Sequence, residues 1–128
     1  MKIKIATLSL ITLIAVVFGL TGCGKHPSTP EEVASAWGEA IAAGDLAEAN
    51  EYTTAETQMA NGILITVVQE DKAGKSKGQI HEGLYNGLKN LKVTKSAVSG
   101  DTAVLHTNVK DITITVKKVD GTWLVVNM

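Results

Sequence analysis

The 128-residue chain has one cysteine and no arginine among its twelve basic residues. A single cysteine cannot form an intrachain disulfide, so a disulfide-stabilised framework is excluded. Arginine supplies the bidentate fork with which many proteins hold phosphate groups and base edges. An arginine-free chain with a formal net charge of −1 is therefore a poor candidate for binding nucleic acid, and we expect no nucleic-acid partner.

Several enzyme and cofactor motifs are also missing. The sequence has no HExxH zinc motif, no CxxC pair, no GxSxG nucleophile turn and no phosphate-binding loop. Its three histidines, His26, His81 and His106, are scattered along the chain and do not form a metal-ligand pattern with the one cysteine. We therefore expect no metal and no cofactor, and we assign no catalytic residue.

The first twenty residues contain the longest uncharged stretch of the chain. Two lysines, Lys2 and Lys4, precede the apolar run from Ile5 to Leu20. A basic start followed by an apolar run is the layout of a secretory signal. The run is also shorter than the roughly 20 residues of a membrane-spanning helix. We interpret residues 1–22 as a signal peptide.

The segment Leu20-Thr21-Gly22-Cys23 resembles the lipobox of bacterial lipoproteins. The resemblance implies cleavage between Gly22 and Cys23 and lipidation at the Cys23 thiol, with residues 23–29 as a lipidated tether. The protein would then be lipid-anchored in the cell membrane or outer membrane and face the periplasm or the exterior, since two or three acyl chains give a long-lived attachment. The alternative is that Cys23 is a buried thiol in an uncleaved anchor.

The remaining residues suffice for one folded domain. Ten of the lysines and all thirteen acidic residues lie in residues 23–128, which gives this part a formal net charge of −3. A chain of this length supports a single hydrophobic core. We expect one α+β domain over residues 30–128.

The first half of this domain carries helix signals. Thr29 can cap a helix that begins at Pro30, with Glu32 at the capping-box position and Gly44 as its stop. One face of this helix is apolar: Val33, Trp37, Ala40 and Ile41.

Two further helices are predicted after Gly44. Asp45 can cap a short helix, and a second capping-box spacing runs from Thr53 to Glu56. The β-branched run 63–68 would also suit a strand. The residues expected to point inward are Leu46, Ala49 and Tyr52 in the short helix, and Met59, Ile63 and Val67 in the next.

The middle of the chain is less regular. Residues 73–78 form a loop, and residues 79–87 are ambiguous because Gly83 and Gly87 weaken a helix. Lys72, Lys75 and Lys77 make this loop basic. We interpret it as solvated, although such lysines could touch anionic headgroups.

The last forty residues change to a strand pattern. Strands are predicted over residues 93–99, 102–108, 112–119 and 122–127, with two-residue hairpin turns at Gly100-Asp101 and Asp120-Gly121. The second turn fixes a register that pairs Lys118 with Trp123, and it places Trp123 on one face with neighbouring apolar residues. That face comprises Ile112, Ile114, Val116, Trp123 and Val125. The fold class is therefore α+β, with N-terminal helices packed on a curved antiparallel meander of about four strands.

Segments at both ends of the domain resemble the nuclear transport factor 2-like superfamily. The matching segments are Pro30-Glu31-Glu32-Val33, Ala43-Gly44-Asp45, Asp101-Thr102-Ala103-Val104 and Lys118-Val119-Asp120-Gly121-Thr122-Trp123. They are similar in particular to its lumazine-binding-like lipoproteins of unknown function. The resemblance implies a cone-like, cystatin-like roll in which the sheet wraps a long helix and leaves a cavity open at one end. Residues 57–87 depart from the pattern.

Three functions are compatible with these features. The first is a non-enzymatic binding module whose cavity holds a small apolar ligand or a protein partner; it is favoured because the catalytic motifs are missing. The second is a structural or assembly lipoprotein that docks another envelope component through its sheet. The third is a small hydrolase or isomerase that uses His106 or His81 with a carboxylate. The candidate ligand-facing residues are Trp37, Tyr52, His106 and Trp123, although both tryptophans also suit a core position.

Overall fold

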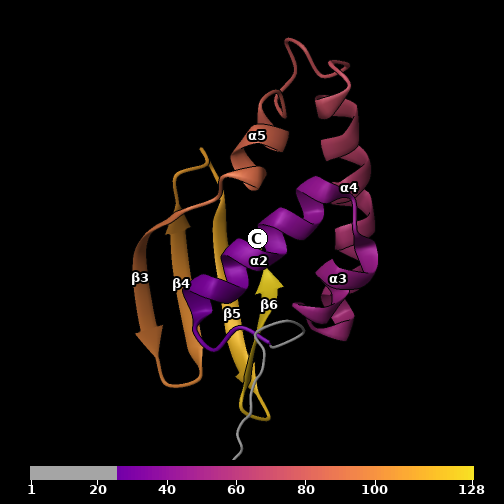
Figure 1. The fold of residues 1–128 in the computed structure, drawn as a ribbon. Helices are drawn as coiled ribbons and strands as arrows, with labels where there is room; N and C mark the ends of the chain where they lie inside the picture. The colour runs from indigo at the N-terminus through magenta and orange to yellow at the C-terminus, as the bar shows by residue number, and fades with distance from the viewer. Residues whose placement is uncertain (1–25) are drawn as a thin grey trace, which may run out of the picture.

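The computed structural model describes residues 26–128 as helices followed by a sheet (Figure 1). The four strands form one antiparallel sheet in the order β3-β4-β5-β6. This arrangement confirms the predicted α+β class. The elements are α2 (Pro30–Ala43), α3 (Leu46–Glu51), η2 (Ala55–Thr57), α4 (Gln58–Lys72), α5 (Leu84–Lys89), β3 (Val93–Ser99), β4 (Thr102–Thr107), β5 (Thr113–Val119) and β6 (Thr122–Asn127).

Helix α2 begins and ends where the sequence predicts. The Thr29 hydroxyl accepts a hydrogen bond from the Glu32 backbone N–H at 3.1 Å. The Glu32 carboxylate accepts one from the Ser28 N–H at 3.2 Å, and this bond lowers the pKa of the Glu32 carboxyl group. Gly44 ends the helix with φ of 75°, a left-handed conformation that glycine adopts without steric strain.

The hairpin registers also follow the prediction. His106 lies opposite Lys95, and Lys118 lies opposite Trp123. Asp120 and Gly121 both have positive φ, of 52° and 82°, as the two-residue turn requires. One face of the sheet is consequently apolar and buried: Ala103, Leu105, Ile114, Val116 and Val125 are fully buried on it, and Trp123 is 8% exposed.

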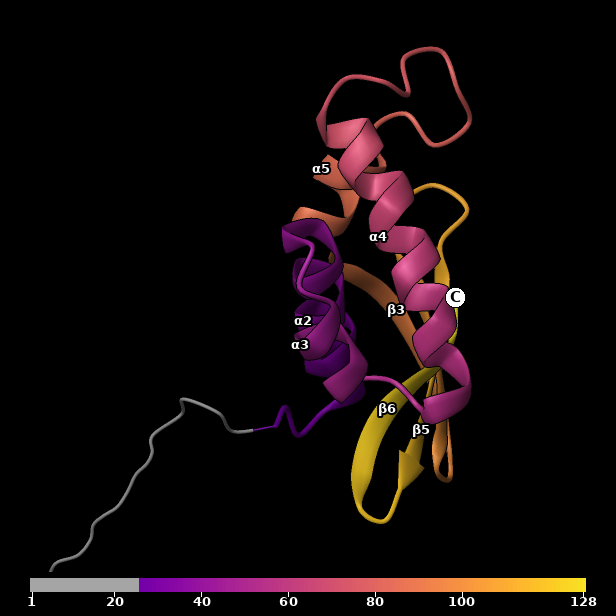
Figure 2. The same ribbon diagram turned by 90° about the vertical axis from the view of Figure 1, so that its right-hand side faces the viewer.

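Helix α2 lies across this apolar face and supplies the opposite half of the core (Figure 1). The turned view shows α2 and α3 as one layer and the sheet as another (Figure 2). The side chains of Val33, Trp37 and Ile41 are fully buried. The predicted apolar face of the first helix is therefore correct, and it faces the sheet.

The two edges of the sheet differ in their surroundings. At the β6 edge, Val125 donates a backbone hydrogen bond to the Tyr52 carbonyl at 2.7 Å, and its own carbonyl accepts one from the Thr54 N–H at 3.1 Å. Thr53 thereby forms a parallel bridge with Val125. At the opposite edge, six of the seven residues of β3 are exposed.

The predicted inward stripe of the third helix is wrong. Residues 58–72 do form a helix rather than a strand, but Met59 is 80% and Ile63 is 64% exposed. The buried positions of α4 are Asn61 and Val68. The helix is rotated because Asn61 finds hydrogen-bond partners inside the domain, a possibility that apolar periodicity does not register. Leu46, also expected inside, is exposed.

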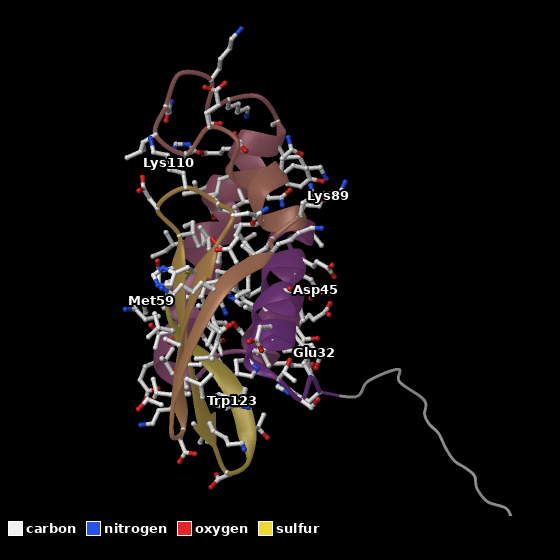
Figure 3. The ribbon with its side chains drawn as sticks, turned by 90° about the vertical axis from the view of Figure 1, so that its left-hand side faces the viewer. Glu32, Asp45, Met59, Lys89, Lys110 and Trp123 are labelled. Carbon is white, nitrogen blue, oxygen red and sulfur yellow. The ribbon has the colours of Figure 1, made fainter. Side chains whose placement is uncertain are left out.

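Replacing Trp123 with alanine should lower the free energy of unfolding by about 3–5 kcal/mol, through lost burial and a residual cavity. Trp123 lies on the helix-covered face of β6, beside the β5–β6 hairpin (Figure 3). Chemical denaturation followed by circular dichroism measures the change. A loss below about 1 kcal/mol, typical of surface sites, would contradict the core assignment.

Candidate functional site

A buried amide organises the interior beneath the candidate site. Asn61 of α4 is fully buried, and its carbonyl oxygen accepts a hydrogen bond from the Trp37 indole N–H at 2.9 Å. Its amide nitrogen donates to the Asn50 side-chain oxygen at 2.9 Å and to the Thr53 hydroxyl at 3.0 Å. The amide thus satisfies its polar atoms and links α2, α3 and α4. It also holds the Trp37 ring in one orientation.

The Trp37 ring forms part of an apolar groove with a volume of about 320 Å³. Nine of the ten lining residues are apolar, and Asp111 adds a carboxylate. The volume is at the lower end of the range for small-molecule sites. The lining residues are Trp37, Ala60, Ile63, Leu64, Val67, Leu84, Leu88, Asp111, Ile112 and Met128.

Helix α4 supplies the longest wall of the groove. Ile63 and Val67 lie one helical turn apart and line it together with Leu64. These two β-branched residues are the ones that the sequence pattern assigned to the core. They face the groove because the Asn61 side of α4 faces the core instead.

Helix α5 and the last strand complete the groove. Leu84 and Leu88 come from α5, and Met128 follows the end of β6. The added Cβ of an alanine at Gly38 would lie 2.9 Å from the Leu88 carbonyl oxygen. Glycine at position 38 therefore lets α2 and α5 approach closely enough to place Leu88 beside Trp37.

Of the four residues proposed to face a ligand, Trp37 lines this groove. Tyr52 lies beside α3, where its hydroxyl donates a hydrogen bond to the Glu48 carboxylate at 3.2 Å. Burial, followed by the negative charge of Glu48, raises the pKa of the Tyr52 hydroxyl. Tyr52 thus forms a local contact of the helical layer.

His106 and Trp123 occupy two further environments. His106 is exposed on β4 and borders a separate hollow of about 300 Å³ formed by residues 106–113. Trp123 packs in the core, and the ammonium group of Lys118 lies 5.5 Å from the centre of its ring. The structure does not bring the four proposed residues together.

Of the three histidines, His26 lies at the start of the described residues and contacts the helical layer. His26, which the lipobox resemblance places in the tether, is half-buried, and its ring lies edge-on to Tyr52 at 5.4 Å. Its ring nitrogens contact the backbone carbonyls of Pro27 and Glu51 at 3.0 and 3.3 Å. Within residues 26–128, no group of three potential ligands is placed to hold a metal ion. The predicted cleavage and lipidation residues, Gly22 and Cys23, lie outside the described residues.

The groove residues of α5 and of the chain beyond β6 were not predicted from the sequence. Leu84 and Leu88 are four residues apart, which is the spacing of one helical face. That signal was obscured by Gly83 and Gly87, which made residues 79–87 ambiguous. Met128 carries no such signal, whereas Ile112 was predicted on the apolar face of the sheet and lies just before β5.

Among the described helices, none is long and apolar enough to cross a membrane. No curated protein and no solved structure matches the chain. A family model, described as "Domain of unknown function (DUF4878)", matches residues 21–126. Because this match covers most of the sequence, the chain belongs to the DUF4878 family.

Proposed function

We propose that the chain is a lipid-anchored envelope protein that binds a small apolar ligand without transforming it. The observation that carries this proposal is the groove of about 320 Å³ with nine apolar lining residues. An accessible apolar groove is costly to keep hydrated, so its filling by an apolar molecule is favourable. A ligand that loses about 200 Å² of apolar surface gains about 5 kcal/mol, part of which the entropy of association offsets.

The fixed orientation of Trp37 supports a binding role. Its indole N–H is bonded to Asn61 and its ring is fully buried, so the ring forms a fixed floor beneath the more exposed groove residues. A pre-organised wall lowers the entropic cost of binding. Apart from Asp111, the residues that line the groove are apolar, which favours an apolar ligand over a polar substrate.

The anchoring half of the proposal rests on the lipobox resemblance at Cys23. His26 already packs on Tyr52, so only Gly24 and Lys25 separate Cys23 from the first packed residue. Three residues of extended chain span about 10 Å. A domain held this closely to a bilayer has direct access to apolar molecules dissolved in it.

We further propose that the domain is related to the nuclear transport factor 2-like superfamily. The support is the order of elements, with helices first and a four-stranded meander last, and the position of α2 across one face of the sheet. An apolar groove bordered by α2 and α4 corresponds to the open cavity that the resemblance implies.

Native mass spectrometry of the full chain, extracted from its own membrane, tests the binding function. We expect an apolar molecule to co-purify with the wild-type chain. Ile63→Glu should lower its occupancy about tenfold or more, because the substitution puts a charge on the groove wall. Met59→Glu is the matched control, since Met59 lies on the same helix but points away from the domain (Figure 3).

Both positions are exposed, so neither variant should change the thermal unfolding seen by circular dichroism. The binding proposal fails if the wild-type chain carries no apolar molecule. It also fails if Ile63→Glu and Met59→Glu retain the molecule equally.

A further inference from the structure

The loop between α4 and α5, residues 73–83, combines positive charge with an exposed apolar side chain. Residues 72–81 contain three lysines and no acidic residue. Lys75 and Lys77 are exposed, and Ile80 is fully exposed to solvent. A large aliphatic side chain in that position has no packing role within the domain.

Two acidic residues next to the loop, Asp71 and Glu82, bond to it, whereas Glu70 of α4 is exposed. One carboxylate oxygen of Asp71 accepts hydrogen bonds from the Ser76 hydroxyl and, at 3.0 Å, from the Gly83 N–H. Its other oxygen accepts one from the Tyr85 N–H at 2.8 Å. The Ser76 hydroxyl, ahead of the two backbone bonds, lowers the pKa of the Asp71 carboxyl group, so Asp71 stays ionised and holds the loop at neutral pH.

These bonds give the loop a defined shape. Ser76 is buried against Asp71, so its neighbours Lys75 and Lys77 are directed outward. The Glu82 carboxylate accepts a hydrogen bond from the Gly78 N–H at 2.9 Å, at the base of the loop. The outer part of the loop therefore presents ammonium groups and the Ile80 side chain, while the Asp71 and Glu82 carboxylates accept hydrogen bonds at its base.

The loop and the start of the domain lie far apart. The chain enters at one end of the domain, and the loop projects from the opposite end (Figure 1). Lys110, in the connection between β4 and β5, lies at the same end as the loop (Figure 3). Lys110 and its neighbour Asp111 border a hollow with Ile80, and their charges offset each other there.

We propose that residues 73–83 form a second membrane contact, in which Ile80 enters the interface of an anionic bilayer and Lys75 and Lys77 approach its headgroups. The proposal rests on the anchoring part of the proposed function. A soluble anion would satisfy the lysines but give no role to Ile80, whereas a bilayer accommodates both. With the acyl chains at one end and this loop at the other, the domain lies with its long axis along the membrane.

A tryptophan placed at the loop tip tests this contact. The full chain carrying Ile80→Trp is reconstituted into vesicles of neutral lipid, or of neutral lipid with anionic phosphatidylglycerol, each containing brominated acyl chains. Trp37 and Trp123 are buried and give a constant background. We expect blue-shifted emission and quenching of the new tryptophan in the anionic vesicles, and little of either in the neutral ones.

Matched variants distinguish attraction of the lysines to anionic lipid from general proximity of the domain to the bilayer. Val98→Trp, at an exposed position near the end of β3 away from the loop, should show the same quenching in neutral and anionic vesicles. Each lysine near an anionic surface contributes a factor of about five, so Lys75→Gln with Lys77→Gln should lower the bound-to-free ratio of the loop about 25-fold. Equal quenching in neutral vesicles would overturn the role of the lysines, and emission like that of Val98→Trp would overturn the contact.

Vesicle flotation in the same samples reports on the anchor independently. If the chain floats with vesicles but the loop tryptophan is not quenched, the loop proposal fails and the anchor stands. If the chain does not float by itself, the anchor fails, and quenching at excess vesicles still decides whether the loop binds an anionic bilayer.

Discussion

Replacing Trp37 with alanine should lower the free energy of unfolding by about 3–5 kcal/mol. Trp37 is fully buried between α2 and the rest of the core, and its indole N–H bonds to Asn61. The substitution removes the ring, leaves a cavity and deprives a buried carbonyl oxygen of its donor. A domain of this size has about 5–10 kcal/mol of stability, so the variant should be close to unfolding at 37 °C. Urea denaturation of the two chains measures the difference.

Trp37→Phe keeps the measurement informative if the alanine variant fails to fold. The phenyl ring fills most of the space but cannot donate to the Asn61 oxygen. The cost should be about 1–3 kcal/mol, the penalty of one unsatisfied buried polar group plus a small cavity. A smaller loss in Trp37→Ala than in Trp37→Phe would contradict the packing role of the ring.

Replacing Cys23 with serine should abolish lipid attachment and retention in the membrane fraction. A hydroxyl group cannot form the thioether that the lipobox resemblance implies, and Cys23 lies outside the described residues 26–128. Cells fed radiolabelled palmitate, fractionated and probed for the protein measure both effects. The wild-type chain should carry label in the membrane pellet, and the variant should not.

The control for this experiment is Ser28→Ala, a small change in the exposed segment before α2. It should leave both label and pellet fraction as in the wild type. If Cys23→Ser still incorporates palmitate or remains in the pellet like the wild type, the anchoring proposal is overturned.

The C-terminal half of the fold could be predicted because its signals are local. The Asp120-Gly121 turn requires positive φ at two positions, and residues that tolerate this conformation are few. Once that turn is placed, the pairing of Lys118 with Trp123 and the burial of one face follow. The capping of α2 by Thr29 and its end at Gly44 are local in the same sense.

The orientation of α4 could not be predicted because it depends on a polar network between distant residues. The pattern Met59, Ile63, Val67 is a good apolar stripe, yet the helix buries Asn61. The amide is tolerated there because Trp37 lies 24 residues before it in the chain and Asn50 lies 11 residues before it. The sequence of α4 alone therefore does not determine which side of the helix is buried.

The candidate site was predicted in part for the same reason. Trp37 was recognised as a ligand-facing candidate because it is a large aromatic residue, and the structure places it at the groove. The opposite wall is formed by the rotated helix α4 and by Leu84 and Leu88 of α5. Helix α5 was not predicted, because Gly83 and Gly87 weaken the helix signal there. Tyr52, His106 and Trp123 were grouped with Trp37 by residue type, but the folded chain separates them.

The bridge between Thr53 and Val125 has a consequence for the order in which the chain can fold. The four strands are joined by short connections, so the meander can form from local contacts. The apolar side of α2 has no sheet to cover until those strands exist, and the link between the helical layer and β6 closes a loop of some seventy residues. During synthesis the docking of the helices on the sheet must therefore wait until the last strand has been made.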